Sequence, residues 1–264
     1  MTSEVLPFSC AVVTGGGGGL GKALSSYLIS KGKRVILAGR TESNLRETME
    51  EIGATDYFVL DTGRVDQIPS FIAEVTKKHP DLDCLINNAG VQRPLQVLKD
   101  QPETFLEKAD EEININIRGP MHLTLGLLEH FKNRPGGATI MNVSSLLGFV
   151  PFSVINPVYY GTKAWLHFWT MNLRSQLAKG GYDSIKVIEI IPPAVGTDLH
   201  RDREDPDDSK KHKNPNALSI EEFMDIVCPR LERGDEVIAP GMSENVVDRW
   251  YKAFGETYQR LSAP

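Results

Sequence analysis

The sequence predicts an α/β fold in which a doubly wound, parallel β-sheet of about seven strands carries helices on both faces. Two observations predict it: short apolar runs alternate with helical patterns, and these runs are rich in β-branched residues. Short, continuously apolar runs are typical of strands that are buried on both faces. Strands that alternate with helices form right-handed βαβ units, which place the strands parallel to one another.

The elements are expected in a regular order along the chain. The expected strands are Cys10–Thr14, Val35–Ala38, Tyr57–Leu60, Cys84–Ile86, Thr139–Val143, Val187–Ile191 and Glu236–Ala239. The expected helices are Leu20–Ser30, Glu42–Ile52, Asp66–Lys78, Ala109–Phe131, Val158–Leu177 and Glu244–Leu261. No repeat or linker interrupts this order, so we expect residues 1–264 to form one domain.

The composition narrows the class of protein. The 264 residues have a net charge of -6, and 41% of them are hydrophobic, which is enough for a large core. A nucleic-acid partner is not expected, because it requires a clustered basic face. No stretch reaches the roughly 20 apolar residues of a membrane span, so no membrane contact is expected. Three widely spaced cysteines and no ligand-spaced histidines predict reduced thiols, no metal and a cytoplasmic protein.

One segment breaks the composition. Arg201–Pro215 is charged, nearly free of apolar residues and interrupted by two prolines, so it cannot bury much apolar surface. It follows the sixth expected strand, where ligand-covering loops lie in open α/β sheets. The pattern predicts either a mobile lid around residues 199–216 or a solvated connector.

A glycine-rich turn follows the first expected strand and precedes the first expected helix. Successive glycines permit a tight turn and close approach of a phosphate, while the helix start offers free N–H groups and a positive dipole end. Because a strand precedes the turn and a helix follows it, we expect a Rossmann-type dinucleotide site. The expected contacts here are Gly15, Gly17, Gly18, Gly19, Leu20 and Gly21.

The end of the second strand indicates which dinucleotide is bound. An acidic residue there would bond the ribose 2′-hydroxyl of NAD, whereas an arginine accommodates the 2′-phosphate of NADP. This chain has Gly39 followed by Arg40, and a guanidinium can make a planar, charge-assisted contact with a phosphate. We therefore expect NADP(H) rather than NAD(H). The alternative is that Arg40 is a solvated residue at the start of a helix.

Tyr159 and Lys163 form a candidate acid/base pair near the start of an expected helix. Residues four apart share a helix face, so the two side chains point the same way. A phenol has an ordinary pKa of about 10, and a nearby ammonium lowers it by favouring the phenolate. The pair alone is a common spacing, and its meaning depends on the motifs around it.

Five motifs in chain order resemble the single-domain short-chain dehydrogenase/reductase family. They are the Gly15–Gly19–Gly21 turn, Asn87–Gly90 (NNAG), Asn116 before Gly119, Ser144–Gly148 and Tyr159–Lys163. The resemblance extends from Val12 to about Thr197. The Asn-Pro-Val-Tyr sequence before Lys163 and the Ile-Pro-Pro-Ala-Val sequence after the sixth strand are similar to the DltE-like branch of that family.

The resemblance implies roles for individual residues. Asn116, Ser145, Tyr159 and Lys163 would be the catalytic set, with Ser145 on the substrate oxygen. Asn116 would kink its helix and hold a water that links Lys163 to solvent, although an ordinary amide cap is the alternative. The further cofactor contacts would be Asp61, Thr62, Asn88, Ala89, Gly90, Pro192, Val195 and Thr197, besides Tyr159 and Lys163.

Two positions depart from the family pattern. Pro193 stands where most members have glycine, which removes a backbone donor near the nicotinamide. The separation from Ser145 to Tyr159 is one residue longer than the commonest spacing, and the loop Phe149–Pro157 is where we expect the extra residue.

The activity that the resemblance implies is NADP(H)-dependent interconversion of a ketone or aldehyde with an alcohol by hydride transfer. Phe149, Phe152 and Val154 favour an apolar small-molecule substrate, and the family's long central helices predict a homodimer or homotetramer. Two alternatives remain open: a redox-silent protein that senses NADP(H), and an enzyme of this fold that acts on an imine or guides a cyclisation.

Overall fold

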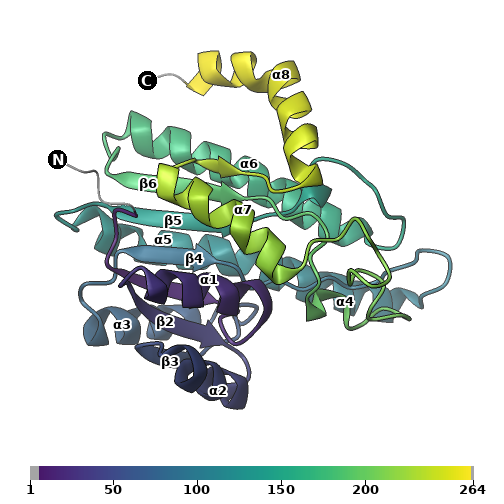
Figure 1. Ribbon diagram of the computed structural model, residues 1–264, viewed down its shortest axis with the longest axis horizontal. Coiled ribbons are helices and arrows are strands. Elements are labelled where there is room, and N and C mark those ends of the chain that lie inside the picture. The colour runs from purple at the N-terminus through teal and green to yellow at the C-terminus, as the bar shows by residue number, and fades with distance from the viewer. Residues whose placement is uncertain (1–5, 263–264) are drawn as a thin grey trace.

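The computed structural model describes residues 6–262 and contains one seven-stranded sheet (Figure 1). Its strands are β1 (Cys10–Thr14), β2 (Arg34–Gly39), β3 (Asp56–Val59), β4 (Cys84–Asn87), β5 (Ala138–Val143), β6 (Ile185–Ile190) and β7 (Val237–Ile238). All neighbours are parallel, in the order β3-β2-β1-β4-β5-β6-β7. The fold class expected from the sequence is confirmed. The strand order reverses between β1 and β4, which is where such sheets bind ligands.

Helices cover both faces of the sheet, and each face has its own apolar core. Helices α1 (Gly19–Ser30), α2 (Glu42–Ile52) and α7 (Ile220–Arg233) bury Leu28, Leu45 and Val227 on one face. Helices α3 (Ile68–Lys78), α5 (Gly119–Lys132) and α6 (Pro157–Lys179) bury Phe71, Leu127 and Leu173 on the other. The last helix, α8 (Met242–Ser262), extends away from the sheet at the C-terminal end (Figure 1).

Three elements differ from the sequence expectation. Helix α7 was not expected, because Pro229 interrupts its pattern; Ser219 and Glu222 form a capping box that starts it, and Phe223, Val227 and Leu231 form its buried face. The single helix expected over Ala109–Phe131 is three elements: α4 (Pro102–Ile113), a π-helical turn (Asn114–Arg118) and α5. The expected seventh strand contains only Val237 and Ile238.

The remaining structural expectations concern thiols and membranes. All three cysteines are free thiols; Cys10 and Cys84 are buried, and Cys228 is partly buried. No helix within residues 6–262 is long and apolar enough to cross a bilayer. In the same part of the chain, no three side chains of the metal-binding types come together in a group that could hold an ion.

Candidate active site

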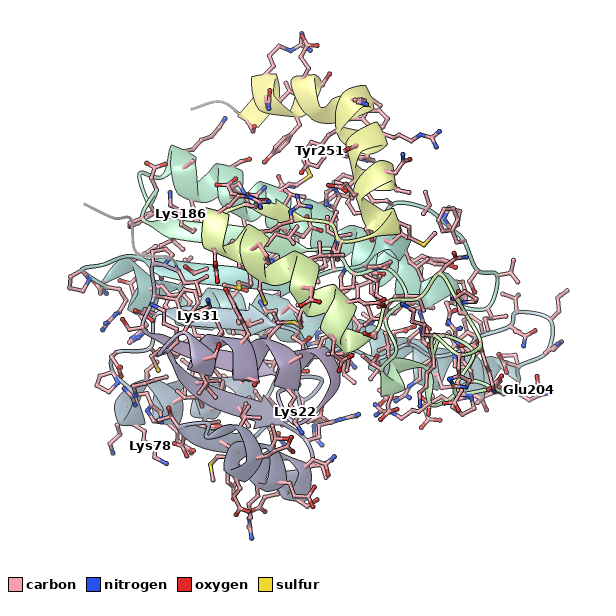
Figure 2. The ribbon with its side chains drawn as sticks, viewed as in Figure 1. Lys22, Lys31, Lys78, Lys186, Glu204 and Tyr251 are labelled. Carbon is pink, nitrogen blue, oxygen red and sulfur yellow. The ribbon has the colours of Figure 1, made fainter. Side chains whose placement is uncertain are left out.

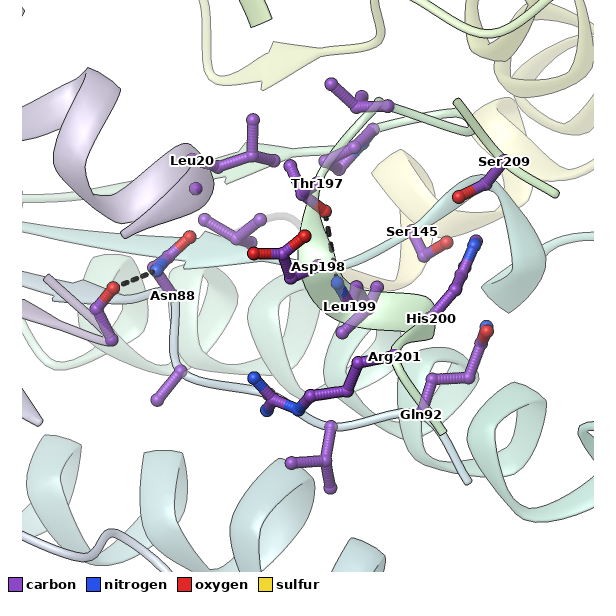
Figure 3. Close-up of a pocket in the computed structure, with 18 of the residues that line it drawn as sticks. Leu20, Asn88, Gln92, Ser145, Thr197, Asp198, Leu199, His200, Arg201 and Ser209 are labelled. Atoms are coloured by element: carbon purple, nitrogen blue, oxygen red, sulfur yellow. Dashed lines mark hydrogen bonds between the residues drawn. The ribbon is translucent and has the colours of Figure 1, made fainter. Parts of the chain in front are cut away.

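A cavity of about 900 Å³ opens at the carboxyl ends of the central strands. Its wall comes from the residues that follow β1, β4, β5 and β6, together with residues 198–214. Leu20 and Asn88 lie on one side of the close-up in Figure 3, and Gln92, Ser145 and His200 gather on the other. The expected cofactor residues found in this wall are Gly15, Gly17, Gly18, Gly19, Leu20, Arg40, Asp61, Thr62, Asn88, Ala89, Gly90, Tyr159, Lys163, Pro192, Val195 and Thr197.

The glycine turn has a backbone that side chains would obstruct. Gly15 and Gly19 have φ angles of +65° and +51°, which favour glycine. A Cβ atom on Gly21 would lie 2.2 Å from the Gly15 carbonyl oxygen, so only glycine allows α1 to pack this closely against the turn. A Cβ atom on Gly18 would meet no atom within 4 Å. The turn is therefore tightly packed at Gly21 and open at Gly18.

Asparagines tie the ends of neighbouring strands together. The Asn88 side chain donates to the Thr14 carbonyl oxygen at 2.9 Å, and the N–H groups of Asn88 and Ala89 donate to Thr14 Oγ1 at 3.0 Å each. The Asn87 amide donates to Asn142 Oδ1 at 2.9 Å, which links β4 to β5. Asn87 and Asn88 are therefore partly structural, as their place at strand ends predicts.

Tyr159 and Lys163 lie one helical turn apart in the first half of α6, and each side chain is buried. The Lys163 Nζ is 5.6 Å from the centre of the Tyr159 ring. It donates a hydrogen bond to the carbonyl oxygen of Val143, the last residue of β5, at 2.8 Å. The end of β5 therefore fixes the ammonium beside the phenol.

Burial sets the protonation states of this pair. Removal from water raises the pKa of Tyr159 strongly, although the Ser145 hydroxyl lowers it in part. Removal from water lowers the pKa of Lys163 to about 8, and Glu112 and Glu189 oppose that shift. The phenol of Tyr159 is consequently protonated at neutral pH, which is the form that can donate a proton.

Ser145 lies just beyond β5, between the phenol and the next loop. Its Oγ accepts the Leu147 N–H at 3.2 Å and caps a short 3₁₀ turn, Leu146–Gly148. The Leu146 N–H donates to the Pro192 carbonyl oxygen at 2.9 Å, which joins the loops after β5 and β6. The position of Ser145 is therefore fixed by its own bond to Leu147 and by the bond between the neighbouring Leu146 and Pro192.

Asn116 lies in the π-helical turn and is buried. Its Oδ1 accepts the Val91 N–H at 2.9 Å, and its Nδ2 donates to the Val91 carbonyl oxygen at 2.8 Å and to Thr162 Oγ1 at 3.1 Å. These bonds hold the segment Asn88–Arg93, which we name the strap, against α6. The site of the expected kink is a π turn, a feature that often occurs at functional sites.

The other end of the cavity contains Arg40. Its side chain is half-exposed, and its Nη1 lies 3.6 Å from Glu111 Oε1 on α4. Asp61 and Thr62 line the same end, and Asp61 Oδ1 accepts the Gly63 N–H at 2.9 Å. Arg40 is thus a cation at the cavity rim, and its ion pair with Glu111 is long and solvent-exposed.

The segment expected to form a lid covers the opposite end. Its Arg203 donates from Nη1 to Asp208 at 2.6 Å and from Nη2 to Gln92 of the strap at 2.6 Å. His200 is buried beneath it; burial, together with Arg203, lowers the pKa of His200 to about 4. Glu204 stands at the outer edge of the molecule (Figure 2). The segment is therefore charged on its outer side and bonded to the strap through Arg203, and its function as a mobile lid stays a prediction.

A buried polar network lies behind Ser145 and was not predicted from the sequence. Glu189 of β6 accepts a hydrogen bond from Ser144 Oγ at 2.6 Å and contacts His167 Nδ1 at 2.9 Å. All three side chains are buried. The available signal was a glutamate inside an apolar strand, because a buried carboxylate requires partners.

The three apolar residues expected near the substrate lie in different places in the structure. Phe152 lines the cavity, whereas Phe149 packs on His167 at 4.3 Å between ring centres, and Val154 is 93% exposed. Of the three, only Phe152 can contact a molecule in the cavity. Trp165 and Trp169 stack on each other in the middle of α6, with 5.3 Å between their ring centres.

Comparison with known proteins agrees with this architecture. The family model for short chain dehydrogenases matches residues 9–208. The chain is 30% identical over 251 residues to the uncharacterized oxidoreductase DltE of Bacillus subtilis (strain 168), and the match covers 95% of both chains.

Solved structures share the fold. A short-chain dehydrogenase from Sphingobium yanoikuyae in complex with NADPH superimposes with a TM-score of 0.79 at 21% identity, covering 97% of this chain and 96% of that one. The closed form of a serine dehydrogenase complexed with NADP⁺ gives a TM-score of 0.71 at 28% identity, covering 83% and 87%. Motifs, strand order and sequence similarity lead to one conclusion: the chain belongs to the short-chain dehydrogenase family of oxidoreductases, in the branch that includes DltE.

Proposed function

We propose that the cavity binds NADP(H) and that the protein interconverts a ketone or aldehyde with an alcohol, with Tyr159 as the acid/base. One observation carries the proposal. A single cavity has the glycine turn and Arg40 at one end, and the buried Tyr159–Lys163 pair with Ser145 at the other. A dinucleotide needs a phosphate cradle and a reaction centre in one continuous space.

The residues present fit a dinucleotide. Gly18 faces open space at the start of α1, where free N–H groups favour a diphosphate. The first turn of α1 contains no acidic residue that would repel it. At the far end, a Cβ atom on Gly90 would lie 3.6 Å from Lys163 Nζ, so glycine leaves room for a ribose beside the ammonium.

The reaction assigns separate tasks to the buried side chains. When bound, the cofactor supplies or accepts the hydride. The hydroxyls of Ser145 and Tyr159 bind the substrate carbonyl oxygen, and the protonated phenol of Tyr159 donates its proton to that oxygen. Lys163 favours the phenolate that remains and orients the ribose. In alcohol oxidation the same phenolate takes the proton back.

The activity is tested with a panel of carbonyl compounds. Oxidation of NADPH is followed spectrophotometrically with ketones, quinones and 3-oxoacyl thioesters, and each assay is repeated with NADH. We expect turnover with at least one class and a preference for NADPH. Tight cofactor binding without turnover of any compound would favour the redox-silent sensor instead.

Arg40→Ala should weaken NADPH binding and leave NADH binding unchanged. Charge-assisted hydrogen bonds contribute about 1.5–3 kcal/mol, which corresponds to a rise of about 10–100-fold in the Kd for NADPH. Fluorescence titration with both cofactors measures the difference. Arg46→Ala is the matched control, because Arg46 is an exposed arginine on α2 that pairs with Glu42. Equal loss of NADH affinity in Arg40→Ala would contradict a role in 2′-phosphate binding.

A further inference from the structure

A buried carboxyl group on α4 has no place in the reaction described above. Glu112 has an exposed fraction of 0%. Its Oε1 accepts the backbone N–H of Arg93 at 3.1 Å, whereas its Oε2 has no hydrogen-bond partner among residues 6–262. A buried carboxyl oxygen without a partner is costly and calls for a reason beyond packing.

The position of Glu112 connects it to the reaction centre. It lies near the end of α4, four residues before Asn116 in the π turn, and both side chains accept N–H groups of the strap. Helix α4 also packs against α6. Asn116 holds Val91 of the strap and Glu112 holds Arg93, two residues further along. The Asn116 Oδ1 lies 3.3 Å, and Lys163 Nζ 3.6 Å, from the point where a Gly90 Cβ would be.

The charges around Glu112 come from several elements. The ionisable groups whose charges act on Glu112, Tyr159 or Lys163 are Arg93, Glu111, Glu189 and Arg203, besides these three themselves. Burial raises the pKa of Glu112 to about 7, and Arg93 and Lys163 oppose that shift. Ionised Glu112 in turn raises the pKa values of Lys163 and Tyr159.

We propose that Glu112 is a positioning residue whose negative charge keeps Lys163 protonated and restrains the ionisation of Tyr159. The inference rests on the proposed function of that pair. A buried ammonium loses its hydration, and a carboxylate in the same region of low dielectric constant restores part of the lost stabilisation. Glu189 of β6 is the second such carboxylate, but Ser144 and His167 already occupy its oxygens. Glu112 is the one with a free oxygen.

Glu112→Gln tests the charge while keeping the shape of the side chain. We expect the NADPH affinity of the wild type to decrease as Lys163 loses its proton near pH 8. In Glu112→Gln the midpoint of that decrease should lie at a pH about one unit lower or more, because the carboxylate that stabilises the ammonium is absent. Fluorescence titration of NADPH against pH needs no substrate. In the reductase assay the alkaline limb of the pH profile should move the same way. Asp110→Asn is the matched control, because it removes an exposed charge from the same helix and should move neither.

A uniform loss of affinity and rate with unmoved inflections would mean that Glu112 only fixes the strap, and the proposal would fall. Rescue of the wild-type inflection by Glu112→Asp, which keeps the charge, would support it. Loss of rate without a shift in Glu112→Asp and Glu112→Gln alike would again indicate a purely structural side chain.

A second measurement is independent of cofactor and substrate. The pKa of Glu112 is raised from about 4.5 to about 7 on folding, so its contribution to stability is full below pH 4.5 and is lost as pH rises to about 7. Glutamine does not ionise, so Glu112→Gln does not lose this stability. The Tm of Glu112→Gln minus the Tm of the wild type should therefore increase as the pH rises from 4.5 to about 7. A Tm difference that does not change with pH would overturn the proposal. If the Tm difference between Glu112→Gln and the wild type changed with pH as expected, but the wild type turned over no carbonyl compound, only the proposed function would be rejected.

Discussion

Tyr159→Phe is expected to lower kcat for carbonyl reduction by about 10²–10⁴-fold, the usual contribution of a positioned general acid/base. The substitution removes one hydroxyl from a side chain that is 4% exposed, so the packing of α6 is kept. In the proposed reaction Ser145 would still bind the carbonyl oxygen, but an alcohol is too weak an acid to replace the phenol. Steady-state oxidation of NADPH with a substrate from the panel measures the loss.

Tyr160→Phe is the matched control for that experiment. Tyr160 is the neighbouring tyrosine on α6, and its hydroxyl donates to the Ser153 carbonyl oxygen at 2.5 Å rather than facing the cavity. We expect this variant to keep most of the wild-type kcat. NADPH titration of both variants separates loss of chemistry from loss of binding. Near-normal turnover by Tyr159→Phe would remove the tyrosine from the proposed reaction.

Gly21→Ala is expected to destabilise the fold by about 3 kcal/mol, which corresponds to a fall in Tm of roughly 6–12 °C. The added methyl group would lie 2.2 Å from the Gly15 carbonyl oxygen and 2.6 Å from Asn88 Nδ2. Backbone cannot move aside as a flexible side chain can, so α1 must shift away from the turn. Thermal unfolding followed by circular dichroism measures the change, and NADPH titration should show weakened binding.

Gly18→Ala provides the comparison within the same turn. Its Cβ atom would meet no atom within 4 Å, and its φ angle of 175° is open to any residue. The Tm of this variant should stay close to that of the wild type. If both substitutions lowered Tm equally, the cause would be loss of glycine as such rather than the contact behind Gly21.

The sheet was predictable because its signals are local. Short apolar runs placed most strands to within a residue or two, and the chain order of strands and helices determined the parallel topology. Helix α7 was not predicted because Pro229 interrupts its pattern, although the Ser219–Glu222 capping box that begins it is a sequence signal. The π turn was not predicted as such, because a turn of five residues is too short for its i→i+5 hydrogen bonding to produce a recognisable hydrophobic period.

The candidate site also contains residues that could be predicted from the sequence and residues that could not. Tyr159, Lys163, Ser145 and the glycines could be selected because their motifs, taken in chain order, resemble those of the short-chain dehydrogenase/reductase family. Glu112 could not, because what matters about it is burial among groups from other elements. Glu189 left one signal, its place inside an apolar strand, but its partners come from other elements as well. The effect of these two glutamates on Lys163 arises from three segments that are far apart in sequence.

The contacts of the segment expected to form a lid could not be predicted from the sequence. The composition of Arg201–Pro215 predicted little burial, yet Ser209 is buried. Arg203 holds the segment in place through hydrogen bonds to Asp208 and Gln92. The sequence does not reveal the second bond, because Gln92 lies more than a hundred residues earlier in the chain. A polar segment can be held in place by ion pairs and amides even where apolar surface is scarce.

The anchoring of Lys163 to Val143 has a practical consequence for redesign. The ammonium is tied to the end of β5, Ser145 follows two residues later, and the backbone of Lys163 packs against Gly148. None of these contacts involves the loop Phe149–Pro157, where we expect the family spacing to be exceeded by one. Within that loop Phe152 lines the cavity and is exposed, so we expect substitutions of Phe152 to change what the pocket admits more than they change the position of Lys163. Asn156 is buried and immediately precedes α6, so the end of the loop must be kept.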